Sequence, residues 1–286
     1  MALMLGMLHA ADSRPERVQS VGVLKHLKAN PSEDGNRCAT LQDLYLPAGF
    51  KADLIAMEPH VKQPIAMTFD ALGRLWVAEA MSYPEKRAKG AGKDRILILE
   101  DYDGDGSFER RQVFADGLNL VSGLEVGFGG VWVGAAPELL FIPDKDRDDH
   151  PDGPAQVMLE GFGFQDTHET LNNLTWGPDG WLYGLQGIFN HAQIGPPETP
   201  VEERIEMRAG VWRYHPLKHQ FEVYAHGGSN PWGLDYDQHG QWFMTHCRSF
   251  WGQGATTHVV RGGHYWNQSN THHANFIEPH PPEEES

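Results

Sequence analysis

Histidine 168 is the side chain in this sequence best suited to acid–base chemistry. It opens the stretch HETLNN (residues 168–173), directly before the strand-like segment LTWGPDGWLYG. The ordinary pKa of a histidine allows it to take a proton from a hydroxyl group near neutral pH. The chain has 16 histidines, so a hydrogen-bonded loop histidine is the alternative. A residue just ahead of an innermost strand would point toward a central funnel, which favours His168 as a general base.

A second candidate is the segment DYDGDGSFE, which has the spacing of a calcium loop. Calcium takes several hard oxygen ligands, and a glycine at position 6, here Gly106, allows the sharp turn. Position 12 is Gln112 rather than Glu, and the loop joins two strands. The alternative is therefore a hairpin loop that caps its own backbone amides. The candidate ligands at positions 1, 3, 5, 7 and 9 are Asp101, Asp103, Asp105, Ser107 and Glu109.

Three further groups have weaker patterns. The run DKDRDD (residues 144–149) occupies the equivalent place in the next repeat, so calcium is the alternative there. It lacks a glycine at position 6 and interleaves two basic residues, so a solvated acidic loop is expected. The segment GGSNPWGL (residues 227–234) is typical of a tight turn that feeds a strand. Five histidines near the end of the chain are expected to be exposed, because their loop-like context supplies no convergent metal geometry. These are His258, His264, His272, His273 and His280.

A repeated strand–turn–strand unit must position these residues. Its four copies are PIAMTFDALGRLWVAE, LEVGFGGVWVGA, LTWGPDGWLYGLQG and LDYDQHGQWFMTHC. Each copy has the turn chemistry of a β-hairpin. Aligned aromatic residues recur at intervals of 56, 51 and 60 residues, at Trp76, Trp132, Tyr183 and Phe243. This period matches one four-stranded propeller blade.

Alternating segments after each hairpin complete the expected blades. They are RILILE, RRQVFA, ELLFIP, AQVMLE, GVWRYH, FEVYAH and THVVRGG. FKADLIA, from Phe50, is expected to be the outer strand that would close the ring against the last blade. Six blades of roughly 55 residues would need about 330 residues after Leu46. We therefore predict an all-β fold, a β-propeller of the six-bladed, TolB-like type truncated to about four blades, in a chain that could also be an N-terminal fragment.

The expected domain organisation has three parts. Residues 1–45 form a leader with a short helix, on which Val18, Val21, Leu24 and Leu27 recur at helical spacing. Residues 46–270 form the partial propeller. Residues 271–286 form a polar, proline-rich tail that is expected to be disordered.

Composition excludes several classes of function. The formal net charge of −16 argues against a nucleic-acid partner, which needs a basic footprint. No apolar run reaches the roughly 20 residues of a membrane-spanning helix. Cys38 and Cys247 form no CxxC or CxxCH motif, so no covalent haem site is present in this chain. The apolar start MALMLGMLHAA is similar to the end of a secretory signal, although an apolar tail explains it equally well.

Taken together, these motifs resemble the N-terminal propeller of large bacterial PVC-type membrane-bound dehydrogenases. That group is related to the PQQ-dependent glucose/sorbosone dehydrogenases. The resemblance runs from about Leu46 to Trp266. It is carried by LPAGFKADLIA, the DGDG loop, VFADGL, HETLNNLTWGPDGWLYG, GVWRYHP, FEVYAHGGSNPWGLD and VVRGGHYW. In fuller relatives, helical repeats and a CxxCH cytochrome segment follow the propeller.

The resemblance implies quinoprotein chemistry. His168 matches the family's general base, which removes the proton of a sugar's anomeric hydroxyl while hydride passes to the quinone. PQQ is the implied cofactor, with Asn230, Gln186 and Arg248 as contacts and calcium as electrostatic support. Ser229 stands where well-understood members have an arginine. The implied partners are a sugar or similar alcohol and a cytochrome c domain or protein, and the implied location is periplasmic or extracellular.

Three functions stay open on the sequence. The first is a PQQ-dependent oxidoreductase that acts on a sugar. The second is a non-catalytic module of a larger cytochrome-containing protein that binds carbohydrate or protein, which Ser229 and the missing blades favour. The third is a calcium-dependent, lactonase-like hydrolase with Glu79, Asn173 and Asn230 as oxygen ligands. Fold alone does not decide among them.

Overall fold

A computed structural model describes residues 45–248 and 255–267, together with four two-residue strands closer to the N-terminus. Among these residues the regular elements are β-strands, apart from the 3₁₀ turn η2 (Val201–Glu203). No helix in this part of the chain has the length and apolar character needed to cross a membrane. The expected helix over Val18–Leu27 and the tail at 271–286 lie outside the described residues.

The first two blades are four-stranded antiparallel sheets whose strands are neighbours in sequence. Blade 1 consists of β7 (Pro64–Phe69), β8 (Leu75–Glu79), β9 (Asp94–Glu100) and β10 (Arg110–Leu118). Blade 2 consists of β11 (Val121–Val126), β12 (Gly130–Ala135), β13 (Glu138–Pro143) and β14 (Gln156–Glu160). These strands match the expected segments closely, because each is an alternating apolar run that ends at a turn signal.

The last two blades are variations on this pattern. Blade 3 consists of β15 (Asn172–Trp176), β16 (Leu182–Gln186), β19 (Gly210–His215), β20 (Gln220–Gly227) and the added strand β24 (His264–Tyr265). A hairpin of β17 (Ala192–Ile194) and β18 (Ile205–Met207) is inserted between β16 and β19. Blade 4 consists of β21 (Ser229–Tyr236), β22 (Trp242–Arg248) and β23 (Ala255–Val259). The prediction of a propeller with about four blades is confirmed.

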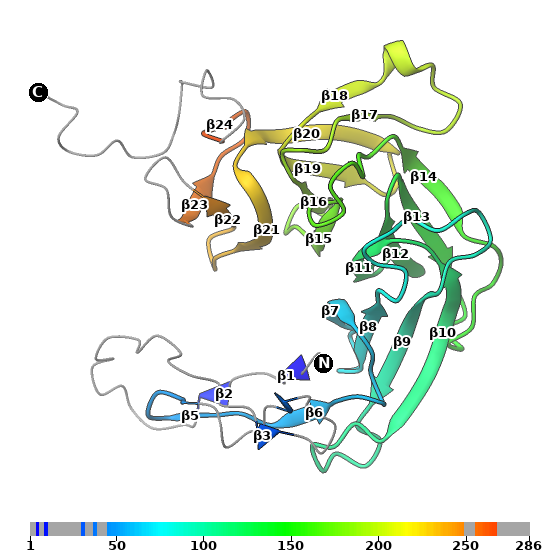
Figure 1. The fold of residues 1–286 in the computed structure, drawn as a ribbon, viewed down its shortest axis with the longest axis vertical. Helices are drawn as coiled ribbons and strands as arrows, with labels where there is room; N and C mark the ends of the chain where they lie inside the picture. Colours follow the sequence, from blue (N-terminus) through cyan, green and yellow to red (C-terminus); the bar gives the residue numbers. More distant parts are fainter. Residues whose placement is uncertain are drawn as a thin grey trace, which may run out of the picture.

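The blades are arranged along an arc, with the first strand of each blade innermost (Figure 1). The strands β7, β11, β15 and β21 therefore face the axis, and neighbouring inner strands contact one another. The outer side of the arc is formed by β10, β14 and β20. This arrangement places the residues at the start of each inner strand around one central region.

Three hydrophobic clusters hold the arc together, one between each pair of neighbouring blades. Trp76 and Phe114 of blade 1 pack with Val131 and Val133 of blade 2. Between blades 2 and 3 the cluster includes Trp132, Leu182 and Trp212. Between blades 3 and 4 it includes Tyr183, Leu234 and Trp242. Apolar burial of this kind is the main contribution that holds neighbouring blades together, because the four blades are separate hydrogen-bonded sheets.

The repeat aromatics occupy the second strand of each blade, but their burial differs. Trp76, Trp132 and Tyr183 are 1–2% exposed, whereas Phe243 is 37% exposed. Along β22 the buried residues alternate with exposed ones. In the part of the chain that the structure describes, no further blade covers this face of blade 4, as a neighbouring blade covers the equivalent faces of the other sheets.

The segment expected to close the ring pairs elsewhere. FKADLIA forms two short strands, β5 (Phe50–Lys51) and β6 (Leu54–Ala56). These pair with β2 (His9–Ala10) and β1 (Met4–Leu5), not with blade 4. A separate two-stranded ladder joins β3 (Asn30–Pro31) and β4 (Arg37–Cys38). The prediction of an outer strand against the last blade is wrong in the described structure, because N-terminal strands of the same chain satisfy that edge.

A glycine makes the fifth strand of blade 3 possible. Strand β24 runs parallel to the end of β20, with Gly227 paired to Tyr265. Gly227 has a φ of +91°, and a Cβ there would lie 1.8 Å from the Tyr265 carbonyl oxygen. Only glycine fits this close approach. The chain can therefore return from blade 4 to the outer edge of blade 3.

Candidate functional site

Asp166 fixes the ring of His168 in the loop between β14 and β15. The Nδ1 atom of His168 lies 2.7 Å from Oδ1 of Asp166, which also accepts a hydrogen bond from the His168 backbone N–H at 3.0 Å. A carboxylate that accepts from Nδ1 leaves Nε2 as the basic nitrogen of the ring. The side chain of His168 is 73% exposed, so it can meet a ligand from solvent.

Asn190, which follows β16, holds the loop that carries this pair. Its Oδ1 accepts a hydrogen bond from the Asp166 backbone N–H at 2.9 Å. Its Nδ2 donates to the carbonyl oxygens of Asp166 and Glu169, at 2.9 and 3.0 Å. The side chain is fully buried, so these hydrogen bonds form without competition from water. Sequence reasoning missed Asn190, because a single asparagine after a strand gives no signal of its own.

A cavity of about 220 Å³ lies beside His168. The Tyr83 ring meets the imidazole edge-on, with ring centroids 5.8 Å apart. Aromatic and aliphatic walls with a few polar groups are typical of sites for small organic ligands. The lining residues are Ile65, Tyr83, Leu120, Val121, Ser122, Thr167, His168, Thr170 and Trp232.

A second cavity, of about 350 Å³, continues along the axis. Residues of all four inner strands line it, and it shares Ile65, Ser122 and Trp232 with the cavity beside His168. His168 therefore lies at the mouth of the axial cavity. Its remaining lining residues are Ala66, Met67, Thr68, Leu124, Glu125, Asn173, Leu174, Thr175, Leu234 and Asp235.

Three buried polar side chains on or next to β15 and β16 lack full hydrogen bonding among the described residues. Glu169, Asn172 and Gln186 are 0–1% exposed. Oε2 of Glu169, Oδ1 of Asn172 and both amide atoms of Gln186 have no partner among the described residues. Such groups are normally satisfied by ordered water or by a ligand. Gln186, expected as a cofactor contact, lines none of the described cavities.

Burial raises the pKa of Glu169 to about 7, a shift that the hydrogen bond from the Phe189 backbone N–H opposes and the charge of Asp166 reinforces. The carboxylate is packed against Gly187, where an added Cβ would lie 2.4 Å from its Oε2 atom. Glycine at 187 thus leaves room for the buried acid that follows His168 in the sequence.

Asn230 and Arg248 belong to neighbouring strands, near the start of β21 and at the end of β22. Asn230 has a φ of +49°, and its Oδ1 accepts a hydrogen bond from the Ile188 backbone N–H at 3.3 Å. Arg248 is exposed and pairs with Ser229 across the β21–β22 ladder. Asn230 therefore follows the residue that pairs with Arg248, and it binds the backbone two residues after the buried Gln186. Neither Asn230 nor Arg248 is among the residues that line the two axial cavities.

The acidic hairpin of blade 1 lies between β9 and β10, away from the inner strands (Figure 1). Carboxylate oxygens of Asp101, Asp103, Asp105 and Glu109 come within 4.8 Å of one another. Asp101 also accepts hydrogen bonds from the backbone N–H groups of Gly104, Asp105 and Gly106 at 2.8–3.1 Å. The backbone therefore has the compact turn in which Asp101 caps its own loop.

The equivalent loop of blade 2 groups Asp144, Asp146 and Asp152 in the same way. Burial, and then the charge of Asp149, raises the pKa of Asp144. Asp149 itself pairs with Arg74 of blade 1 at 2.6 Å. Part of this acidic run therefore serves contact between blades.

The three residues considered as lactonase ligands do not share one donor set. Glu79 is fully buried, accepts hydrogen bonds from the Lys62 backbone N–H at 2.7 Å and from Nε of Arg95 at 2.8 Å, and lies outside both axial cavities. Asn173 lines the axial cavity, and Asn230 binds the Ile188 backbone. An Arg-paired carboxylate is held by its partner, so Glu79 is not a free ligand.

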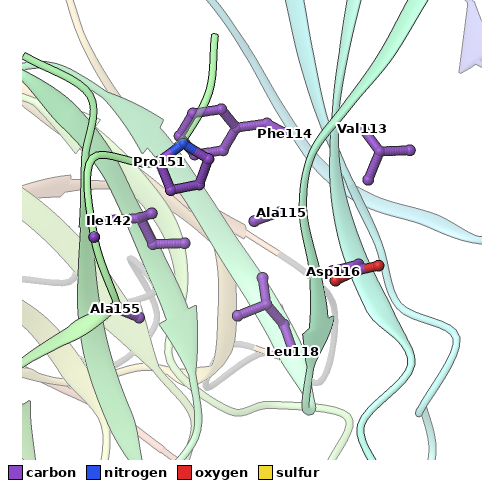
Figure 2. Close-up of a pocket in the computed structure, with 9 residues that line it drawn as sticks. Val113, Phe114, Ala115, Asp116, Leu118, Ile142, Pro151 and Ala155 are labelled. Atoms are coloured by element: carbon purple, nitrogen blue, oxygen red, sulfur yellow. The ribbon is translucent and has the colours of Figure 1, made fainter.

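Figure 2 shows a third cavity, of about 450 Å³, at the outer rim between β10 and blade 2. Its wall is mostly aliphatic, with Phe114, Leu118 and Ile142, and Asp116 is the one acidic side chain that lines it. This cavity carries no arrangement of acid, base and nucleophile. His168, Glu125, Asn173 and Asp235 instead line the two axial cavities.

The fold and this site define a β-propeller with a polar axial site. Residues 37–283 match the family described as "Domain of unknown function (DUF7133)". The chain therefore belongs to that family. No curated protein matches the chain.

Solved structures that are similar include PQQ-dependent sugar dehydrogenases and gluconolactonase-like propellers. A protein from Thermus thermophilus described as an oxidoreductase (glucose dehydrogenase) is 18% identical, with a TM-score of 0.45 over 72% of this chain and 64% of that one. The PQQ-bound aldose sugar dehydrogenase of Streptomyces coelicolor is 14% identical, with a TM-score of 0.45 over 72% and 62%. The chain thus covers less than two thirds of these structures, and such identities transfer no residue's role.

Proposed function

We propose that the protein acts on the hydroxyl group of a sugar or similar alcohol, with His168 as the general base of a dehydrogenase of the glucose/sorbosone type. The observation that carries this proposal is the Asp166–His168 pair at the mouth of the axial cavity. Asp166 holds Nδ1, so that Nε2 can accept the hydroxyl proton. Tyr83 and Trp232 beside it supply the aromatic surface on which the apolar face of a sugar ring packs.

PQQ, the cofactor that the resemblance implies, is a planar tricarboxylate, so its site needs positive charge. No Lys or Arg lines either axial cavity. Arg248 is an exposed cation that lines neither of these cavities, and the buried Gln186 lines none of the described ones. The described residues therefore do not fit the quinone by themselves.

A non-catalytic, carbohydrate-binding propeller is the second candidate. The missing cations around the cavities favour it, because such a module needs aromatic walls and hydrogen-bonding groups but no electron acceptor. The two candidates, proton abstraction by His168 and carbohydrate binding without catalysis at the mouth of the axial cavity, differ in one respect. Only the first makes turnover depend on Nε2 of His168.

The wider context is part of the proposal. We place residues 46–270 in the propeller of a larger dehydrogenase of the PVC type, with residues 1–45 as leader and 271–286 as tail. Residues Asp101, Asp103, Asp105, Ser107 and Glu109 would hold calcium at the blade 1 hairpin. A six-bladed ring, a cytochrome c partner and a periplasmic or extracellular location complete this proposal.

The test is dye-coupled oxidation of a panel of aldoses by the purified chain, with PQQ and calcium added. The chain offers a matched pair of histidines for it. His150, like His168, has a side chain that is 73% exposed and pairs with an aspartate two residues earlier, but it lies in the outer loop of blade 2. If His168→Asn abolishes turnover and His150→Asn leaves it intact, the result supports His168 as the general base. Sugar binding without turnover in the wild-type chain selects the binding module.

A further inference from the structure

The loop between β13 and β14 of blade 2 repeats the acid spacing of the blade 1 hairpin. Asp144, Asp146, Asp148 and Asp152 stand at its positions 1, 3, 5 and 9, which are also the positions of the four grouped acids in blade 1. Carboxylate oxygens of Asp144, Asp146 and Asp152 lie within 4.8 Å of one another. Groups of exposed acids are common without any ion, so the surroundings of the individual carboxylates decide between a cation site and a solvated loop.

Asp144 is the buried member of this group, with 7% of its surface exposed, whereas Asp146 and Asp152 are exposed. The Oδ1 atom of Asp144 is buried and has no hydrogen-bond partner among the described residues. In blade 1, by contrast, both oxygens of Asp101 accept hydrogen bonds from backbone N–H groups of their own loop. A buried carboxylate oxygen without a donor is normally satisfied by a water molecule or an ion.

The charges around Asp144 favour an ion of positive charge. Burial raises the pKa of Asp144, and the negative charges of Asp149 and Asp148 act in the same direction. Hydrogen bonds from the backbone N–H groups of Asp148 and Arg147 oppose the shift. None of the three grouped acids forms an ion pair within the described residues, and the basic side chains of the loop are exposed. A buried acid in such a place is normally paired or coordinates a metal.

The backbone of the loop has the same turn as the calcium-like hairpin, although it lacks the glycines. Arg147 and Asp149 have φ angles of +60° and +68°. They stand at positions 4 and 6, where blade 1 has Gly104 at +77° and Gly106 at +93°. The missing glycine at position 6 therefore does not change the turn. Residues other than glycine keep this conformation only where their surroundings hold it.

The same loop also connects blade 2 to blade 1. Asp149 pairs through Oδ2 with Nη1 of Arg74 at 2.6 Å, and its carbonyl oxygen accepts a hydrogen bond from Nε2 of Gln112 at 2.7 Å. Pro151 lines the outer-rim cavity together with Phe114 of β10 (Figure 2). The grouped acids stand on both sides of these contacts in the sequence. An ion that joins them therefore fixes the segment that touches blade 1.

We propose that this loop binds calcium through the carboxylates of Asp144, Asp146 and Asp152, and that the bound ion fixes the loop against blade 1. Calcium accepts irregular shells of oxygen ligands in which carboxylates are completed by backbone carbonyls and water. The site lies in the outer loop of blade 2. It does not depend on the proposed activity of His168.

Isothermal titration calorimetry of the full chain with calcium alone measures the affinity. All proteins carry Asp103→Asn and Asp105→Asn, so that the blade 1 hairpin does not contribute. We expect this background protein to bind calcium at one site. Asp146→Asn changes an exposed side chain and is expected to weaken the affinity by roughly tenfold or more. Asp152→Asn should have a similar effect, and its amide oxygen can still accept the hydrogen bond that the Lys145 backbone N–H donates to Asp152 at 2.6 Å.

Asp237→Asn is the matched control for the loss of one negative charge in a loop. Asp237 accepts hydrogen bonds from the backbone N–H groups of His239 and Gln241 in the β21–β22 hairpin of blade 4, each at 2.9 Å. It belongs to neither group of acids in the described structure. Its replacement is expected to leave the calcium affinity unchanged.

Hydrogen exchange locates the ion. Calcium should slow the exchange of the backbone amides of residues 144–152 in the background protein, and should have little effect on them in the Asp146→Asn variant at the same calcium concentration. Three results would overturn the proposal. They are an absence of calcium binding in the background protein, an affinity that both Asp146→Asn and Asp152→Asn leave intact, and protection by calcium that appears only outside residues 144–152.

Discussion

The carboxylate of Asp166 holds the imidazole of His168 at 2.7 Å, Oδ1 to Nδ1, on a loop that the buried side chain of Asn190 fixes from behind. One short hydrogen bond therefore sets both the orientation and the tautomer of an exposed histidine. The arrangement is that of a positioned base rather than of a freely rotating surface side chain. His168 lines an axial cavity, whereas the His150–Asp148 pair lies in the outer loop of blade 2. This difference gives the first prediction.

Replacing Asp166 with Asn removes the charge that holds Nδ1 and keeps the size of the side chain. We expect turnover in the dye-coupled assay to fall by about tenfold to a hundredfold, with little change in KM, because Asp166 positions the base and does not touch the substrate. Steady-state kinetics across pH checks this. The matched variant is Asp148→Asn, which alters the His150 pair; an equal loss of turnover there would contradict a specific role for Asp166.

Glu169 makes stability depend on pH. Its pKa is about 7 in the folded protein against 4.5 for an ordinary glutamate, so the folded state holds the proton more tightly. The free energy of unfolding should therefore fall as pH rises from about 4.5 to about 7, by up to about 3 kcal/mol, and then level off. Urea unfolding of the chelator-treated protein at several pH values measures this slope. The Glu169→Gln variant should show a shallower one, and an unchanged slope would refute the assignment.

Gly187 is expected to tolerate no side chain. An added Cβ would lie 2.4 Å from both Cβ and Oε2 of Glu169. Gly187→Ala should lower the free energy of unfolding by roughly 1–3 kcal/mol. Gly153 is the control, because a Cβ there meets nothing within 4 Å and its φ is not in the left-handed region. Chemical denaturation of both variants decides the point, and equal stabilities would count against the close packing of Glu169 on Gly187.

The arrangement of the blades predicts that truncating equivalent repeat aromatics lowers the free energy of unfolding by unequal amounts. Trp132 is buried between blades 2 and 3, whereas Phe243 stands on the uncovered face of blade 4. Trp132→Ala should cost about 3–5 kcal/mol of unfolding free energy, and Phe243→Ala about 1 kcal/mol or less. Thermal unfolding of the two variants compares them. Similar losses would mean that blade 4 is covered as the others are.

The blades could be predicted from the sequence because their signals are local. ELLFIP and GVWRYH appear as β13 and β19 with the predicted bounds, since each is an apolar run between turn residues. Each repeat aromatic pairs across its ladder with a polar residue that lines the axial cavity and stands seven or eight positions earlier in the sequence. This offset has meaning only once the strands pair. These polar residues are Thr68, Glu125, Thr175 and Asp235.

Features that depend on contacts between residues far apart in the sequence could not be predicted from such local signals. The parallel return of β24 requires Gly227 to lie against Tyr265, and the clamp by Asn190 requires two loops to meet. FKADLIA was assigned to the wrong partner, because any alternating segment fits any open sheet edge. The role of His168 stays a prediction, since its surroundings depend on Tyr83 and Trp232 from other blades.

The most direct test of the account follows the ring nitrogens of the histidines by NMR while the ¹⁵N-labelled protein is titrated with aldoses. We predict that His168 carries its proton on Nδ1 and that its Nε2 resonance shifts on binding, while the resonances of His150 stay in place. A sugar that binds without moving Nε2 of His168, or that moves both histidines alike, would contradict the claim that a substrate hydroxyl meets this base.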